Sequence, residues 1–395
     1  MMASTSKIWV SELNARPEVR SAFPKNPVRF YDTTLRDGEQ TVGVVLSPQQ
    51  KLEIAKKLDD LEVSRIEAGF PRVSVEDAEA IQLMQRAGIK AELWGFSRAV
   101  KADVDELVRL GLKASVIESP TSEIKLKAYG ISRDELLKRV TEAVATAKKS
   151  GITVAFFAVD STRTQLEFLK KVYLAALDAG AAEIVVVDTI GACGPEAAEF
   201  LVSQVCQWVG PSVPVHWHGH NDFGMATACG VAAVRGGATW IQGTINGMGE
   251  RAGNADISEI ALALRCLYDV PVALNLTKVR EVSQVVAKSS GYTLDAWKPL
   301  VGENLFMRES GAVASQFHIP EAIEPYSSEL VDARRKIVLG KKSGLDSIDL
   351  KAKELGLTVS AEQRAAILAE VKKRAIAKRG LLTDDEFRQI VNSSR

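Results

Sequence analysis

The stretch from Val28 to Gly69, VRFYDTTLRDGEQTVGVVLSPQQKLEIAKKLDDLEVSRIEAG, holds one complete strand, helix and second strand. The runs VRFYD and RIEAG are rich in β-forming residues, and between them Ser47 can cap a helix whose first position suits Pro48. The apolar residues on one face of this helix are Ile54, Leu58 and Leu61. A helix with a single apolar face can cover a sheet, so the stretch predicts two parallel strands joined by a crossover helix.

The same alternation of short β-rich runs and helical segments continues to about residue 275. The eight strand-like runs are 28–32, 65–69, 91–96, 114–118, 153–160, 183–188, 213–220 and 240–244. Eight is the number of strands in a (β/α)8 TIM barrel, an α/β fold of about 250 residues. The sequence therefore predicts a TIM barrel.

After about residue 275 the strand rhythm stops, and we expect a mainly helical C-terminal extension. It contains a well-bounded helix over 360–380, with Ser360 and Gln363 as a capping box and Gly380 as its stop. The predicted division is an N-terminal extension over 1–27, a catalytic barrel over 28–275, and a lid and dimerisation region over 276–395.

The composition excludes several classes of function. Lys and Arg together number 50, as do Asp and Glu, so the formal charge is zero and bulk electrostatics attracts neither nucleic acid nor an anionic membrane. The four cysteines form no CxxC pair, which is typical of reduced thiols. The N-terminal segment lacks the apolar stretch of a signal peptide. We expect a cytoplasmic protein that acts on small molecules.

Three of the four histidines lie in HWHGH at 216–220, at the end of the seventh run. Because alternate strand residues point the same way, His218 and His220 can converge on one metal ion. Barrels of this kind carry their active sites at the C-terminal strand ends, where Asp37 follows the first run. One carboxylate and two imidazoles are typical of a catalytic metal site with positions left for substrate. His216 lies deeper and is interpreted as a packed interior residue.

Three motifs together resemble one known family. They are DTTLRDGEQ at 32–40, HGHND at 218–222 and GMGERAGN at 247–254. On eight strand-like runs, they resemble the metal-dependent acyltransferase and lyase family of isopropylmalate, homocitrate and citramalate synthases and hydroxymethylglutaryl-CoA lyase. The segment 323–344, IEPYSSELVDARRKIVLGKKSG, is similar to one that the synthases carry after the barrel. The resemblance covers about residues 28–345 and is closest to the short synthases.

The resemblance implies an acyl-CoA:2-oxo acid acyltransferase that uses acetyl-CoA as co-substrate and a divalent ion (Mg, Mn or Zn), as a homodimer. The metal ligands that it implies are Asp37, His218, His220 and Asn254. Arg36 would steady the oxygen of the enolate made from acetyl-CoA. Thr189 would bind the carboxylate of the oxo acid, and Arg163 would lie in the substrate pocket.

Two features of the synthase pattern are missing, and both concern the catalytic base. The synthases usually read FxHESGIH after the barrel, whereas this chain reads FMRESGAV at 306–313, so Val313 replaces the last histidine. The strand-five glutamate of the synthases aligns with Val159. The candidates for a replacement base are His318, Tyr326, Glu67 and Asp160.

Several alternatives stay open at this point. The protein could be a synthase of the homocitrate or isopropylmalate type, a carbon–carbon lyase of the same family, or a metal-binding homologue without turnover. Arg36 could merely pair with Asp32 or Glu39, and Thr189 could be only a loop cap. The adjacent Glu250 and Arg251 could pair to hold their loop. The sequence does not fix the oxo acid or the metal.

Overall fold

The computed structural model describes residues 7–394, and the strands of its larger part close into a barrel of eight parallel strands in sequence order. The strands are β1 (Arg29–Asp32), β2 (Arg65–Glu67), β3 (Glu92–Arg98), β4 (Ala114–Pro120), β5 (Thr153–Val159), β6 (Glu183–Asp188), β7 (Val215–Gly219) and β8 (Trp240–Gly243). Each lies within or beside one of the eight predicted runs. The barrel closes where β1 pairs with β8, with Asp32 beside Gly243. The predicted TIM barrel is confirmed.

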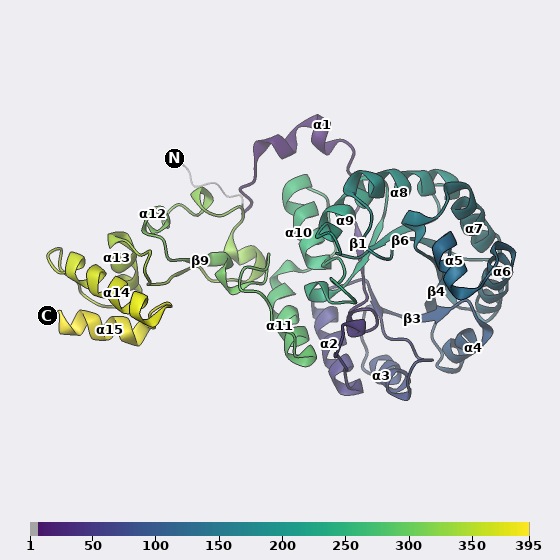
Figure 1. Cartoon of the computed structure of the whole chain (residues 1–395), viewed down its shortest axis with the longest axis horizontal. Coiled ribbons are helices and arrows are strands. Elements are labelled where there is room, and N and C mark those ends of the chain that lie inside the picture. Colours follow the sequence, from purple (N-terminus) through teal and green to yellow (C-terminus); the bar gives the residue numbers. More distant parts are fainter. Residues whose placement is uncertain (1–6, 395) are drawn as a thin grey trace. The chain divides into compact units, whose positions relative to one another are not determined.

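Helices surround the strands as an outer ring (Figure 1). They are α2 (Pro48–Asp60), α3 (Val75–Arg86), α4 (Lys101–Arg109), α5 (Glu123–Tyr129), α6 (Arg133–Lys149), α7 (Leu166–Asp178), α8 (Pro195–Val209), α9 (Ala226–Arg235) and α10 (Ile257–Tyr268). In α2, Ser47 and Gln50 exchange both hydrogen bonds of a capping box, and Pro48 occupies the first turn. Ile54, Leu58 and Leu61 are fully buried. The predicted first helix is therefore confirmed.

The barrel interior is filled by alternate residues of its strands. The buried cluster there contains Tyr31, Trp94, Phe96, Ala114, Val116, Ala155, Phe157, Val185, Val187 and Trp240. These side chains fill the interior of the barrel. Polar chemistry is consequently confined to a few inward positions and to the C-terminal strand ends.

The chain forms two compact units, one of residues 11–294 and one of residues up to 10 together with 295 onward. The first also contains α1 (Pro17–Arg20) and α11 (Val279–Ser290). The second contains β9 (Met307–Arg308), α12 (Gly311–Ala314), β10 (Lys336–Ile337), α13 (Leu345–Glu354), α14 (Arg364–Lys378) and α15 (Asp384–Ser393).

The helix predicted over 360–380 is shorter than expected at both ends. Ser360 and Gln363 do exchange both capping-box hydrogen bonds, of 3.0 and 3.4 Å. However, a turn follows them, so α14 begins at Arg364. At the other end Arg379 adopts the left-handed conformation (φ 56°), and the prediction that Gly380 ends the helix was wrong by one residue.

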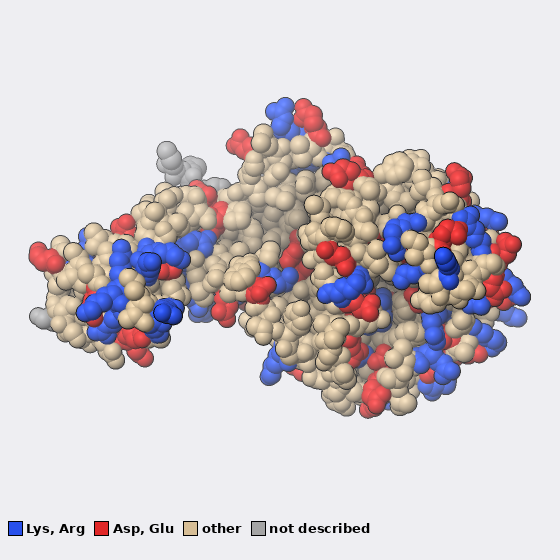
Figure 2. All heavy atoms as spheres, viewed as in Figure 1, with Lys and Arg blue, Asp and Glu red and all other residues tan. Residues whose placement is uncertain are grey.

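Acidic and basic side chains are interspersed over the face drawn in Figure 2, in line with their equal numbers. Among the helices of residues 7–394, none is long and apolar enough to cross a membrane.

Candidate active site at the barrel mouth

Three polar side chains converge at the C-terminal end of the barrel. The Nε2 atom of His218 lies 3.1 Å from Oδ2 of Asp37, and Nε2 of His220 lies 3.8 Å from the same oxygen. The two Nε2 atoms are 3.4 Å apart. Ligand atoms on one ion with bonds of about 2.1 Å are separated by about 3 to 3.5 Å. The separations of 3.1 and 3.4 Å lie in this range and that of 3.8 Å slightly exceeds it, so the three atoms can converge on a single divalent ion.

The surroundings of these side chains also fit a metal ion. All three are buried, with exposed fractions of 2% for Asp37, 1% for His218 and 8% for His220. Asn254 pairs with His220 in a β-bridge, and its Nδ2 donates to the carbonyl of Met248. Its Oδ1 is buried without a partner among the described residues. A carboxylate, two imidazoles and an amide oxygen are ligands suited to Mg²⁺, Mn²⁺ or Zn²⁺.

Electrostatics keeps Asp37 ionised. Burial alone would raise the pKa of its carboxyl group, but the neighbouring Arg36 guanidinium and the two imidazoles hold that pKa well below its usual range. Burial also lowers the pKa of His220 to about 4. The carboxylate and a neutral imidazole are the forms that bind metals.

His216 lies one alternation deeper and has a different environment. Its Nε2 lies 2.7 Å from Glu183 Oε2, and its Nδ1 lies 3.2 Å from the amide nitrogen of Gln242. Arg65 binds Glu183 with both terminal nitrogens, at 2.6 and 3.0 Å. The His216 ring stacks on Trp240 at 5.5 Å between centroids. Since both ring nitrogens are engaged, the interpretation of His216 as a packed interior residue is confirmed.

Arg36 is fixed beside this centre from three sides. Its Nε donates to Glu67 at 2.6 Å, its Nη1 lies 3.4 Å from Asp37, and its guanidinium lies 4.1 Å above the ring of Phe96. Its Nη2 is buried and has no partner within the described chain. The geometry leaves one N–H group of Arg36 to donate to an oxygen of a bound molecule.

The alternative that Arg36 pairs with Asp32 or Glu39 was wrong. The carboxylate of Asp32 accepts from the backbone and hydroxyl of Thr34, both at 2.9 Å. Glu39 binds Lys51 at 2.5 Å. Asp32 and Glu39 therefore have other partners. The Arg36 guanidinium is bound instead by Glu67 of β2.

Glu67 accepts a hydrogen bond from Arg36. It is fully buried, and its second oxygen accepts from the hydroxyl of Tyr31 at 3.2 Å. Burial raises the pKa of Glu67, although Arg36 opposes the shift. With both oxygens occupied, Glu67 is placed to orient Arg36.

Thr189, Asp160 and Arg163 belong to one network on the β5 and β6 side of the mouth. The Thr189 hydroxyl accepts from the backbone N–H of Asp160 at 2.7 Å. Asp160 is fully buried and binds Arg163 through Nε and Nη2, at 2.8 and 2.7 Å. It also accepts from Ser122 at 2.5 Å. Asp160 is therefore engaged as an anchor, while the Thr189 hydroxyl can still donate a hydrogen bond.

The GMGERAGN loop encloses Asn254. Gly249 has φ 157°, and a Cβ there would lie 2.2 Å from Asn254 Nδ2, so only glycine fits this approach. Arg251 binds Asp222 at 2.9 Å, whereas Glu250 is 3.7 Å away. The alternative that Glu250 and Arg251 hold each other is thus minor, because Arg251 mainly ties its loop to HGHND.

The candidates outside the barrel lie in the second unit. His318 is exposed. Tyr326 is buried, and its ring packs edge-on against Phe306 at 5.9 Å. Val313 is partly buried. Their roles stay predictions.

Glu118, near the end of β4, was not among the residues predicted from the sequence. Its register partners are Arg98 of β3 and Phe157 of β5. Burial raises the pKa of Glu118 to about 7, and the charge of Glu67 adds to the shift while Arg36 opposes it. One signal could have found it, because Glu118 is the only charged residue in the predicted strand ASVIE and shares the inward parity of Ala114 and Val116.

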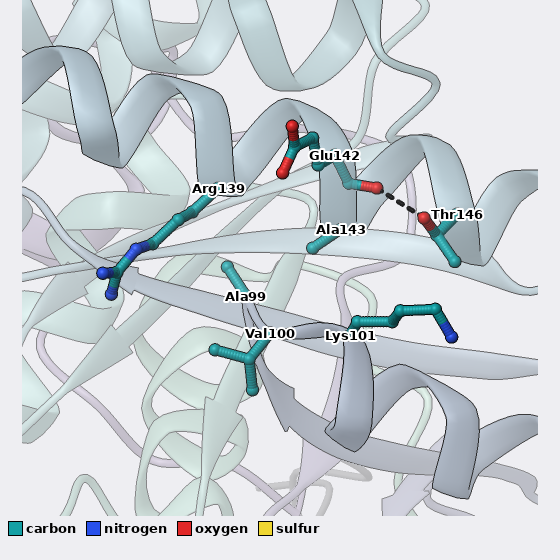
Figure 3. A pocket seen from close by; sticks show the side chains of 7 residues that line it. All are labelled: Ala99, Val100, Lys101, Arg139, Glu142, Ala143 and Thr146. Atoms are coloured by element: carbon teal, nitrogen blue, oxygen red, sulfur yellow. Dashed lines mark hydrogen bonds between the residues drawn. The ribbon is translucent and has the colours of Figure 1, made fainter.

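Two surface grooves differ in their relation to this site. One of about 250 Å³ begins at Arg36 and is lined by Gln40, Phe70 and Val73 among others. The other, of about 430 Å³, lies between the start of α4 and α6 (Figure 3). The hydrogen bond drawn between its labelled residues joins the Thr146 hydroxyl to the backbone carbonyl of Glu142. Only the first groove reaches the candidate centre.

Sequence and structure comparisons identify proteins that this chain resembles. Residues 27–286 match the family model described as HMGL-like. The chain is 37% identical to a homocitrate synthase of Methanothermobacter thermautotrophicus over 391 residues, 98% of each protein. It is 41% identical to a 2-isopropylmalate synthase of Methanocaldococcus jannaschii over 92% of this chain and 71% of that protein. A crystal structure of a hydroxymethylglutaryl-CoA lyase from Pseudomonas aeruginosa superposes with a TM-score of 0.61 at 18% identity, covering 69% of this chain and 95% of that one.

Proposed function

Because the chain belongs to the HMGL-like family, we propose that it is an acyltransferase that condenses acetyl-CoA with a 2-oxo acid. The observation that carries the proposal is the convergence of Asp37, His218 and His220 beside the fixed guanidinium of Arg36. Identity of 37 to 41% to a homocitrate synthase and a 2-isopropylmalate synthase supports condensation.

We propose that Asp37, His218 and His220 hold one divalent ion, with Asn254 contributing its Oδ1 directly or through water. Such an ion supplies a Lewis acid for the ketone of the oxo acid. Mg²⁺, Mn²⁺ and Zn²⁺ all suit this set of ligands.

The side chains around the centre provide what the organic step needs. The unpartnered Nη2 of Arg36 can donate to the thioester oxygen as negative charge develops on it. The Thr189 hydroxyl can donate to the carboxylate of the oxo acid. Arg163 is half-exposed at the same rim, although Asp160 already holds its guanidinium.

The groove that begins at Arg36 suits the acyl-CoA. Exposed valines border it, since Val45 and Val73 are 84% and 69% exposed. Apolar surface next to a fixed cation matches a thioester arm whose carbonyl oxygen must reach Arg36. We propose that acetyl-CoA approaches the centre along this groove.

The test is to give the purified protein acetyl-CoA, one of Mg²⁺, Mn²⁺ or Zn²⁺, and a panel of 2-oxo acids of different side-chain length and charge. Release of free CoA with at least one acceptor is the expected result. Cleavage of a 3-hydroxyacyl-CoA or a 4-hydroxy-2-oxo acid, without any condensation, would replace the synthase by a lyase. Absence of both reactions would leave a metal-binding homologue.

We also propose, from the family resemblance, a cytoplasmic homodimer in which residues 276–395 form the lid and dimerisation region. Mixing His218→Ala with Tyr326→Phe protein under subunit exchange tests a lid supplied by the partner. Random pairing would then restore about a quarter of the parental activity, because half the dimers would hold one intact site. A monomer in light scattering would contradict the proposal.

A further inference from the structure

Glu118 points into the barrel near the candidate metal centre. Ala114 and Val116 of β4 belong to the interior cluster, and alternation along the strand places Glu118 next on the same face. On the neighbouring strand its register partner is Phe157. The Phe157 ring in turn contacts the ring of His218, at 5.1 Å between centroids. Only one aromatic side chain thus separates the strand position of Glu118 from a candidate ligand.

Glu118 also differs from the other carboxylates at the barrel mouth in its contacts. Glu67 is held by Arg36 and Tyr31, and Asp160 by Arg163 and Ser122. Within residues 7–394, the carboxylate of Glu118 has neither a hydrogen bond nor an ion pair, and the residue is only partly buried. It is free to meet a bound molecule.

The position of Glu118 bears on the carboxylate that the chain lacks on β5. Val159 pairs in register with Pro120, so Glu118 lies one inward position below that pair on the adjoining strand. The charged groups that act on it are Arg36 after β1, Glu67 of β2, Arg98 of β3 and Asp103 of α4. Arg98 is neutralised by Asp103, with bonds of 2.8 and 3.0 Å. Arg36 also binds Glu67, but its Nη2 has no partner within residues 7–394, so it is the cation at the mouth that can still donate to a molecule bound beside Glu118.

We propose that Glu118 is the catalytic base, replacing from β4 the carboxylate that Val159 removes from β5. This inference rests on the proposed condensation. The Glu118 carboxylate takes one proton from the methyl carbon of acetyl-CoA, and the C–H electron pair forms the enolate, whose oxygen faces Arg36. The enolate carbon bonds to the ketone carbon of the oxo acid. The carbonyl π pair moves to the ketone oxygen, which takes a proton from water, and the resulting hydroxide takes the proton of Glu118. A second water then attacks the thioester carbonyl of the adduct, the C–S bond breaks, and CoA leaves as the thiol.

The ionisation of Glu118 suits this task. Burial raises the pKa of its carboxyl group to about 7. A base is most effective when its pKa lies near the working pH, because it is then largely deprotonated and still basic enough to take the proton. An ordinary exposed glutamate would be a weaker base.

The test compares the parent protein with Glu118→Gln, Glu118→Asp and the control Glu142→Gln, which removes an exposed carboxylate from α6. Each is assayed for CoA release with the best acceptor of the panel, for exchange of the acetyl-CoA methyl protons in D₂O, and for bound metal. We expect Glu118→Gln to lower kcat and the proton exchange at least 100-fold. Bound metal should change little, and the thermal midpoint at pH 7 should not fall. Glu142→Gln should stay within about twofold of the parent.

The pH profile separates a base from a structural residue. In the parent, kcat/KM should fall on the acid side of about pH 7, since the base must be deprotonated. Glu118→Gln should lose this acid limb, and Glu118→Asp should regain it at a reduced rate. Activity of Glu118→Gln within fivefold of the parent, an unchanged acid limb, or loss of metal together with activity would each overturn the assignment. A parent inactive with every acceptor would instead overturn the proposed function itself.

Discussion

The two histidine layers of the barrel lie one strand alternation apart, yet they differ in how completely their nitrogens are used. His216 engages both ring nitrogens, with Glu183 and Gln242. His218 and His220 direct their Nε2 atoms toward one oxygen of Asp37, and both Nδ1 atoms lack partners among residues 7–394. The comparison teaches that a structural histidine is recognised by a complete set of partners, whereas a candidate ligand shares one acceptor with its neighbour.

The largest expected effect comes from substituting a histidine of the upper layer, which consists of His218 and His220. His218→Ala should remove the bound divalent ion and lower activity by more than about 1000-fold, because one of three ligands is lost and the ketone loses its activation. Metal per chain by mass spectrometry and CoA release are the measurements. Retention of one ion per chain would refute the ligand assignment.

Breaking the lower layer should affect stability instead of metal binding. His216→Ala leaves Glu183 and Gln242 without the imidazole and opens space beside Trp240. We expect the free energy of unfolding to fall by about 2 to 4 kcal/mol, read from urea unfolding. The variant should keep one ion per chain, and loss of the ion would mean that the two layers are not independent.

A smaller effect is expected at Glu67, which binds Arg36 beside Asp37. Glu67→Gln should lower kcat/KM by about 10- to 100-fold, because Arg36 loses its charged partner, while the metal content stays at the parental level. Glu92→Gln is the control in the lower layer, since Glu92 binds Arg65 from an exposed position. Equal effects of the two substitutions would show that Glu67 has no special role.

The smallest effect concerns the stability contributed by Glu118. The folded state holds the proton of Glu118 up to about pH 7, against 4.5 for an ordinary glutamate. The stability that protonated Glu118 contributes to the folded state is therefore fully present below pH 4.5 and is lost as the pH rises to about 7. Glu118→Gln should raise the thermal midpoint by about 2 °C at pH 8.5 and by less at pH 5. A difference independent of pH would contradict the raised pKa.

The sequence was sufficient to predict the barrel. The alternation of strand-like and helical runs, and the residues that cap helices, can be recognised from residues that are neighbours in the chain. All eight strands and the Ser47 cap follow from neighbours in the chain. It was also sufficient to group Asp37 with His218 and His220, since barrel strand ends meet at one face. The partner of Arg36 was missed because it comes from the next strand, through inward-pointing side chains rather than proximity in sequence.

Glu118 was missed for a related reason. Glu118 stands out because its carboxylate has no hydrogen-bond or ion-pair partner among residues 7–394. This follows from the pairing of Arg98 with Asp103 and of Arg36 with Glu67. That depends on side-chain geometry in three other strands or loops. The length of the 360–380 helix was also misjudged, because capping hydrogen bonds can close a turn before the helix begins.

The pairing of β1 with β8 has a consequence for the way the molecule folds. The candidate ligands lie on both sides of this junction, Asp37 after β1 and His218, His220 and Asn254 on the far side. Asp37 is separated from the other candidate ligands by 181 positions (to His218) to 217 positions (to Asn254) of chain. An ion could therefore bind all of them only after the barrel has closed, and it would then hold the closed barrel together. By mass action it would slow reopening of that junction more than it would speed folding. The rate of metal release would then report how fast the closed barrel first opens.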